Sequence, residues 1–193
     1  MKPDQNVSFS DDSTALKLVL AGDGAVGKTS LCKRLANDFF PSGYDLTVGC
    51  EIHSKKVPVS TVVSNGSKST KSLSLVLWDL AGQSHFEETR KLFYKGTKGA
   101  LVVFDVTSRG SFYDVSDWVR EIRRNAPEAP FVLVGNKADK KDREVSRQEG
   151  EELAKKLGVP YLETSAQTSL NVETVFTQIT RLALQNDKDV IAC

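Results

Sequence analysis

The chain has 193 residues, of which 39% are hydrophobic and 26% charged, a size and composition that fit one globular α/β domain. Lys and Arg number 26 against 25 Asp and Glu, and this net charge of +1 excludes a strong field for nucleic acid or an anionic membrane. Three widely spaced cysteines exclude a disulfide framework and a zinc site, and no apolar stretch approaches the ~20 residues of a membrane span, so we expect a cytoplasmic protein.

Residues 1–14 are polar and are expected to form a flexible extension before a single domain at 15–185. An apolar strand at 15–20 is followed by a helical stretch at 30–36. Strands are expected at 50–63 and 72–79 as an antiparallel pair, because an Asn-Gly step lies between them. The Ser- and Lys-rich stretch 64–72 predicts a long, solvated tip to this hairpin.

Three further apolar runs at 100–104, 131–134 and 161–164 alternate with helices. The first helix has an apolar stripe from Phe112 to Ile122, and the second has a capping box at Ser146 and ends at Gly158. The last helix begins near Val172. This order predicts a doubly wound, mostly parallel six-stranded sheet with one antiparallel edge strand and helices on both faces.

The tail at 186–193 has no Cys four residues from its end, which argues against ordinary C-terminal prenylation. One terminal cysteine, Cys193, without a basic stretch leaves peripheral membrane attachment open.

Residues 22–29 read GDGAVGKT, a phosphate-binding loop signature between a strand and a helix. The alternative is a glycine-rich turn that only caps the helix. Lys28 would reach phosphate oxygens and Thr29 would ligate Mg²⁺, which indicates a P-loop NTPase fold. The predicted phosphate contacts are Gly22, Gly24, Ala25, Val26, Gly27, Lys28, Thr29 and Ser30.

A second element, WDLAGQ at 78–83, follows a strand, so Asp79 should lie at the carboxyl edge of the sheet. Asp79 could hold Mg²⁺ through a water, and the amide of Gly82 could contact a γ-phosphate. Taken alone, an Asp at a strand end is usually a cap or turn residue.

Two later strand ends carry the elements Asn136-Lys137-Ala138-Asp139 and Thr164-Ser165-Ala166-Gln167. A carboxylate only accepts hydrogen bonds, so Asp139 suits the N1–H and amino group of guanine and not the N1 lone pair of adenine. A backbone amide of the second element could donate to guanine O6. Either element alone could be a polar loop. The predicted base contacts are Asn136, Lys137, Asp139, Ser165, Ala166 and Gln167.

In this order, the four elements resemble the Ras-like small GTPases over residues 15–185. The stretch DLAGQSHF from Asp79 and the stretch GALVVFDVT from Gly99 are closest to the Rab branch. The phosphate loop looks more like that of the Rho branch, but the helical insertion that Rho proteins carry after the Asn-Lys-x-Asp element is missing.

The resemblance implies two switch segments, at 39–47 and from Gln83 to about Tyr94. It assigns Phe40 and Tyr44 to the nucleotide and Thr47 to Mg²⁺ and the γ-phosphate, while Gln83 would orient the attacking water beside Lys28. No Arg lies between Phe40 and Thr47, which implies slow intrinsic hydrolysis, below about 1 s⁻¹.

The resemblance also implies a monomer that binds GTP or GDP and meets an exchange factor, a GTPase-activating protein and effectors, in trafficking-type or signalling regulation. Gln167 replaces the family's usual Lys, which predicts weaker packing over the base. Leu46 and Ser84 also depart from the pattern and leave partner identity open. Two alternatives remain, a GTP-bound scaffold that does not hydrolyse and an ATP-using P-loop kinase, although the Asn-Lys-x-Asp element disfavours the kinase.

Overall fold

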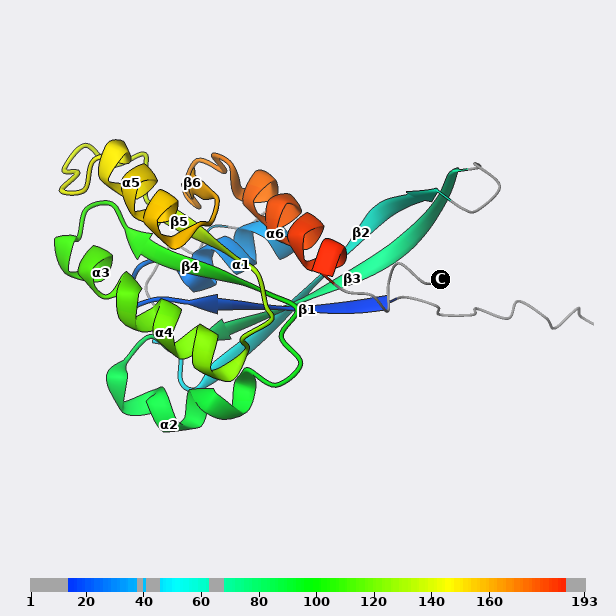
Figure 1. Cartoon of the computed structure of the whole chain (residues 1–193). Coiled ribbons are helices and arrows are strands. Elements are labelled where there is room, and N and C mark those ends of the chain that lie inside the picture. Colours follow the sequence, from blue (N-terminus) through cyan, green and yellow to red (C-terminus); the bar gives the residue numbers. More distant parts are fainter. Residues whose placement is uncertain (1–13, 38–39, 41–45, 63–67, 187–193) are drawn as a thin grey trace, which may run out of the picture.

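The computed structural model describes residues 14–37, 40, 46–62 and 68–186, and it joins six strands in one sheet (Figure 1). The strand order is β2-β3-β1-β4-β5-β6, with β2 antiparallel to β3 and the other neighbours parallel. This confirms the predicted topology. The strands are β1 (Thr14–Ala21), β2 (Cys50–Val62), β3 (Lys68–Leu80), β4 (Gly99–Asp105), β5 (Phe131–Asn136) and β6 (Tyr161–Glu163).

Helices cover both faces of the sheet (Figure 1). They are α1 (Lys28–Asn37), α2 (Glu87–Arg90), α3 (Arg109–Tyr113), α4 (Val115–Asn125), α5 (Arg147–Leu157) and α6 (Val172–Asn186). Leu31 of α1 and Phe176 of α6 share one apolar core, and Ile122 of α4 and Ala154 of α5 share the other. Strands β4 and β5 are buried along their whole length between these cores, which explains their continuous apolar runs.

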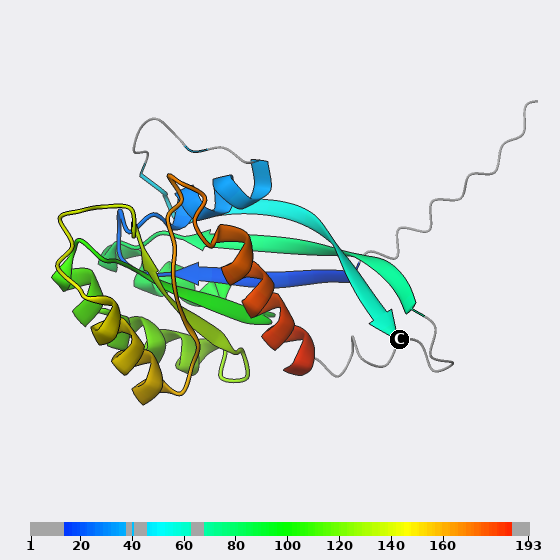
Figure 2. The same cartoon turned by 90° about the horizontal axis from the view of Figure 1, so that it is seen from above.

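Strands β2 and β3 continue beyond the sheet as a two-stranded arm (Figure 2). The pairing of β1 with β3 begins at Leu73, whereas the β2–β3 ladder extends to Val62 opposite Lys68. The predicted hairpin tip at 64–72 is therefore wrong for residues 68–72, which are strand; residues 63–67 lie outside the described residues. Polar composition suggested a loop, but an arm with no third strand beside it has no core that would require apolar residues.

The single helix expected over 112–122 is two helices, α3 and α4, which meet at Asp114. The first begins at Arg109, three residues before the predicted apolar stripe, because the Ser108 hydroxyl accepts a hydrogen bond from the Ser111 amide and so caps it. The ψ angle of Asp114 is −9°, well away from the helical value near −42°, and this interrupts the helix. The apolar stripe nevertheless faces one core.

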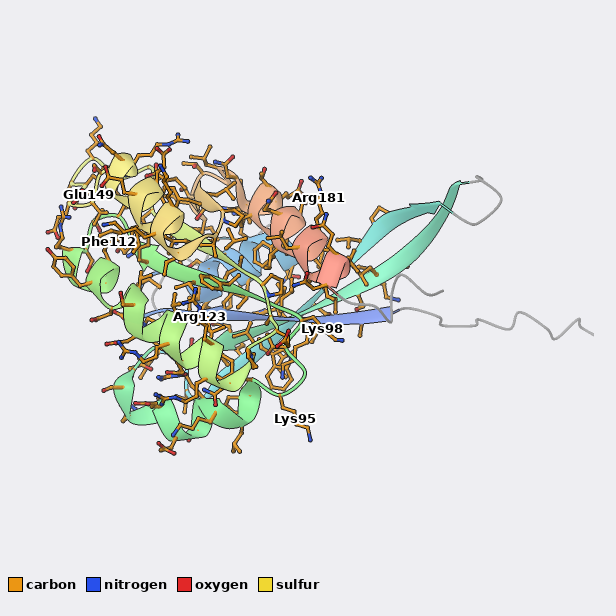
Figure 3. The ribbon with its side chains drawn as sticks, in the orientation of Figure 1. Lys95, Lys98, Phe112, Arg123, Glu149 and Arg181 are labelled. Carbon is orange, nitrogen blue, oxygen red and sulfur yellow. The ribbon has the colours of Figure 1, made fainter. Side chains whose placement is uncertain are left out.

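Helix α5 has the predicted ends. The Ser146 hydroxyl accepts from the Glu149 amide at 3.2 Å, the Glu149 carboxylate accepts from the Ser146 amide at 2.8 Å, and Gly158 has a φ of 71°. Glu149 also accepts from Arg109 at the start of α3. Glu149 and Phe112 of α3 accordingly lie at the same end of the molecule (Figure 3). None of the helices in the described part of the chain is long and apolar enough to cross a membrane.

Candidate functional site: a nucleotide cavity at the carboxyl edge of the sheet

The loop between β1 and α1 bends through backbone conformations that favour glycine. Gly22 and Gly27 have φ values of 143° and 99°, and Ala25 has a φ of 63°. A Cβ on Gly27 would lie 2.3 Å from the side-chain nitrogen Nδ2 of Asn136, and a Cβ on Gly22 would lie 2.1 Å from the Val103 carbonyl oxygen. These two glycines are thus required by close packing as well as by the turn.

The side chain of Lys28 is buried inside this loop, with 6% of the residue exposed. Its ammonium donates to the carbonyl oxygens of Gly22 at 2.8 Å and Asp23 at 2.7 Å. Burial lowers the pKa of Lys28 to about 8, while the nearby carboxylates of Asp79 and Asp23 act against this shift. The loop therefore holds a cation at its centre, where an anion bound to the loop amides would lie.

Three oxygen-bearing side chains from separate parts of the chain meet beside Lys28. The Thr29 hydroxyl at the start of α1 donates to Oδ2 of Asp79, and the Thr47 hydroxyl lies 3.4 Å from the same oxygen. The two hydroxyl oxygens are 3.0 Å apart. Asp79 is fully buried, which raises the pKa of its carboxyl group, and its Oδ1 atom has no hydrogen-bond partner among the described residues. This buried, unsatisfied oxygen beside two hydroxyls fits a hard cation such as Mg²⁺.

The segment after β3 packs directly against the phosphate loop. A Cβ on Gly82 would lie 2.2 Å from the carbonyl carbon of Asp23 and 2.4 Å from the amide nitrogen of Gly24. The Gln83 side chain lies over Gly24, with its Nε2 atom 3.4 Å from the position of a Cβ there. Its Oε1 atom is buried and lacks a hydrogen-bond partner within the described chain. Gly82 and Gln83 therefore line the site beside the phosphate loop.

The other end of the site is built from the loops after β5 and β6. The Ser165 hydroxyl donates to Oδ1 of Asp139 at 2.5 Å and so fixes the orientation of this carboxylate. Lys137 has a φ of 63°, and its ammonium lies 2.6 Å from Oδ2 of Asp105. Asn136 donates to the Val26 carbonyl oxygen at 2.9 Å and accepts from the Thr164 hydroxyl at 3.0 Å. Asn136 thereby joins the phosphate loop to both of these loops.

One cavity of about 410 Å³ connects the two ends. The predicted site residues that line it are Gly24, Ala25, Gly27, Lys28, Thr29, Ser30, Phe40, Thr47, Gly82, Gln83, Asn136, Lys137, Asp139, Ala166 and Gln167.

Three residues that were predicted to contact the nucleotide directly, namely Gly22, Val26 and Ser165, are not among the residues that line the cavity. Each instead bonds a residue that does line it: Gly22 bonds Lys28, Val26 bonds Asn136 and Ser165 bonds Asp139. Asp79 is likewise not among the lining residues and bonds Thr29. Tyr44 is outside the described residues.

Sequence reasoning missed Lys33, Lys140 and Arg34. Lys33 and Lys140 line the cavity, and the Lys33 ammonium nitrogen lies 3.9 Å from Oε1 of Glu51 on β2. Arg34 donates to the carbonyl oxygens of Ala166 at 2.8 Å and Gln167 at 3.2 Å. Its guanidinium also lies 5.9 Å from the centre of the Phe40 ring. For Lys33 and Arg34, only the positive charge of α1 could have indicated a role, because their partners are distant in the sequence.

A mostly parallel sheet with a phosphate loop after its first strand, a buried loop lysine and an Asp-Thr-Thr cluster defines a P-loop nucleoside triphosphatase. The sequence matches the Ras family over residues 17–185, so the chain belongs to this family and is a small GTPase.

The curated relatives are similar over most of the chain. The Ypt/Rab-type GTPase YPT7 of Saccharomyces cerevisiae is 38% identical, and the match covers 90% of this chain and 83% of that protein. The Ras-related protein Rab-15 of Homo sapiens is 35% identical, with 88% and 76% covered. The Ras-related protein SEC4 of Candida albicans is 37% identical, with 85% and 75% covered. Within the family, the chain is therefore closest to the Rab branch.

Proposed function

We propose that the protein is a guanine-nucleotide switch that binds GTP and GDP with Mg²⁺, hydrolyses GTP slowly and recruits effector proteins in the GTP state. One observation carries this proposal. A single cavity has Lys28 and the Thr29–Asp79 pair at one end and the Ser165-oriented carboxylate of Asp139 at the other. The first end suits a polyphosphate and the second suits guanine, because a carboxylate accepts the two adjacent N–H groups of that base.

The oxygen cluster supports a magnesium site. Thr29 and Thr47 would ligate the ion directly and Asp79 would hold it through a water, since the unpaired Oδ1 atom of Asp79 needs a partner. Bound Mg²⁺ would neutralise charge on the phosphate oxygens.

Hydrolysis in this site depends on positioning. Gln83 would orient a water through its buried, unpaired Oε1 atom, and Lys28 and the loop amides would stabilise charge on the phosphate. The sequence has no Arg from Phe40 to Thr47 that could act as an arginine finger in cis. Since such a finger contributes about 10³- to 10⁵-fold, we expect an intrinsic rate below about 1 s⁻¹ that a GTPase-activating protein would raise.

An apolar surface beside the switch segments supports effector binding. Leu46, Ile52 and Leu92 are 56%, 55% and 76% exposed. Ile52 pairs with Trp78 across β2 and β3, and the Trp78 ring lies 5.8 Å from that of Phe93. Exposed apolar side chains gathered near one another are typical of protein interaction sites, and Ile52 forms such a group here with the half-buried Trp78 and Phe93. Recruitment would depend on nucleotide because Thr47 and Gly82 line the same cavity.

The proposal extends to setting and organisation. Residues 15–185 would act as a monomeric domain, to which Thr14 of β1 and Asn186 of α6 also belong, regulated by an exchange factor in vesicle trafficking or signalling. Cys32 and Cys50 are both free thiols, which suits a reducing compartment such as the cytoplasm, and any membrane contact of this protein would be peripheral.

The test is nucleotide identification and hydrolysis on the purified protein. We expect GDP or GTP to be released on denaturation, GDP to outcompete ADP by at least about 10³-fold, and bound GTP to convert slowly to GDP in a single turnover that needs Mg²⁺. Preference for ATP would contradict the proposal in favour of a kinase. Tight GTP binding with no conversion over a day would instead indicate a non-hydrolysing scaffold.

A further inference from the structure

Arg90, the last residue of α2, is an arginine inside the protein, with 3% of the residue exposed. Its Nε and Nη2 atoms donate to the two carboxylate oxygens of Glu121 on α4, each at 2.9 Å. The Tyr94 hydroxyl donates to the same carboxylate at 3.0 Å. Glu121 therefore holds the guanidinium in one orientation through a bidentate ion pair that water barely reaches.

The third nitrogen of Arg90 contacts the backbone of the second switch. Nη1 donates to the carbonyl oxygens of Ala81 at 3.2 Å and Gln83 at 2.8 Å. These two carbonyls flank Gly82, the residue whose backbone packs on Asp23 and Gly24 of the phosphate loop. One side chain thus fixes the Ala81–Gly82 and Gln83–Ser84 peptide units, which come before and after the Gly82–Gln83 peptide.

A second set of contacts joins Arg90 to the phosphate loop. The guanidinium lies over the Trp118 ring, 4.4 Å from its centre, and the Trp118 indole N–H donates to Oδ1 of Asp23 at 2.7 Å. Contacts therefore run from Asp23 through Trp118 and Arg90 to Gln83, and they close where Gly82 meets Asp23. This ring of contacts fixes the distance between the phosphate loop and the Gln83 backbone.

We propose that Arg90 is a positioning residue for GTP hydrolysis, which holds residues 81–83 against the phosphate loop so that Gln83 orients the attacking water. This inference rests on the proposed function. Arg90 acts through Gln83 and not as an arginine finger, because its three nitrogens already donate to protein oxygens. Lysine cannot replace it, since an ammonium lacks the planar fork that bonds a carboxylate and two carbonyls together.

The test compares Arg90→Lys with a matched control, Arg120→Lys, on the full-length protein. Arg120 lies on α4 and pairs with Asp117, but 67% of its side chain is exposed. Both changes keep the charge. We expect Arg90→Lys to slow single-turnover GTP hydrolysis by about 10- to 100-fold, as a misplacement near 1 Å does in other enzymes, with GDP affinity within about 3-fold of wild type. Arg120→Lys should match wild type in both measurements.

Trp118 supplies a spectroscopic signature. The chain has two tryptophans, so Trp78→Phe leaves Trp118 as the only one. In that background we expect its fluorescence to differ between the GDP form and the form with a non-hydrolysable GTP analogue. Arg90→Lys should abolish this difference, because the Trp118 ring loses the guanidinium packed on it.

A second variant separates positioning from folding. Arg90→Met with Glu121→Gln removes both charges of the buried pair, so neither is left unpaired, and it should unfold near the wild-type temperature yet hydrolyse as slowly as Arg90→Lys. Wild-type hydrolysis in Arg90→Lys would overturn the proposal. The proposal would also be overturned if both variants lost GDP affinity by as large a factor as they lost hydrolysis rate, because Arg90 would then stabilise the whole nucleotide pocket and not the position of Gln83 alone.

If the wild-type protein binds GTP and does not hydrolyse it, the proposed function fails, and hydrogen exchange decides the anchoring role separately. Faster amide exchange at residues 82–84 in Arg90→Lys than in Arg120→Lys would support the anchor. Equal exchange would overturn it.

Discussion

Replacing Asp139 by Asn tests which base the cavity accepts with the smallest possible change of shape. The Ser165 hydroxyl donates to Oδ1 of Asp139, and an asparagine oxygen can accept the same bond. Ser165 would therefore hold the new amide in the orientation of the old carboxylate. The substitution places an N–H₂ donor where the carboxylate has its second acceptor oxygen.

The expected loss of GDP binding free energy follows from this single replacement of an acceptor by a donor. Guanine would lose one hydrogen bond to a charged acceptor, about 1.5–3 kcal/mol, and would meet an unpaired donor whose desolvation costs about 1–3 kcal/mol more. The sum of about 2.5–6 kcal/mol is a weakening of GDP binding by about 10²- to 10⁴-fold. Xanthine carries a carbonyl in place of the 2-amino group, so it presents an acceptor to the new donor, and xanthosine diphosphate should bind more tightly than GDP.

The assay is a competition titration of GDP and xanthosine diphosphate against a fluorescent nucleotide. Ser165→Ala is the control, because it removes only the group that orients Asp139. We expect this control to weaken GDP binding by about 3- to 10-fold, the value of one hydrogen bond, without a change of base preference. Asp139→Asn protein that still prefers GDP would refute the assignment of this carboxylate to the base.

Three further substitutions test other groups. Thr29→Asn removes the hydroxyl bonded to Asp79 and should weaken a GTP analogue at least about 10-fold more than GDP in the same titration; equal losses would contradict the Mg²⁺ assignment. Gln83→Leu replaces a side chain whose Oε1 atom is buried and unpaired, so single-turnover hydrolysis should slow by about 10²-fold or more with nucleotide affinity kept, and an unchanged rate would mean that another group positions the water. Hydrogen bonds from Arg109 and Ser146 lower the pKa of Glu149 to about 2 from its usual 4.5. In urea unfolding, the free energy of unfolding of wild type should therefore exceed that of Glu149→Gln by its full amount above pH 4.5, and this difference should vanish as pH falls toward 2. A difference between the two proteins that does not change with pH would refute the ion pair.

The phosphate loop, Asp79 and Asp139 could be predicted from the sequence because each is a local pattern directly after an apolar strand. Parallel strands bring their carboxyl ends to one edge, so locating the strands was enough to gather these residues. The helix ends of α5 were equally predictable, since the capping box at Ser146 and the glycine at 158 act within one turn.

Contacts made across the fold were not predictable. Arg34 meets Ala166 across 132 residues, and Arg90 meets Glu121 across 31, so no local pattern marks either pair. The antiparallel pairing of β2 with β3 was predicted, but residues 68–72 of β3 were missed for a different reason. A two-stranded arm beyond the core needs no apolar side chains, and residues 68–72 therefore read as loop.

The side chain of Asn136 connects the two ends of the cavity by hydrogen bonds. Its amide nitrogen donates to Val26 in the phosphate loop, its oxygen accepts from Thr164 after β6, and only 1% of the residue is exposed. An amide is the side chain that offers both a donor and an acceptor here, whereas a carboxylate would face the Val26 carbonyl with a second acceptor. The base end and the phosphate loop are therefore linked directly through one buried side chain. Among the described residues, the Thr47 hydroxyl contacts Thr29 at 3.0 Å and Asp79 at 3.4 Å, so we expect nucleotide release to open the cavity at Thr47 before the base end.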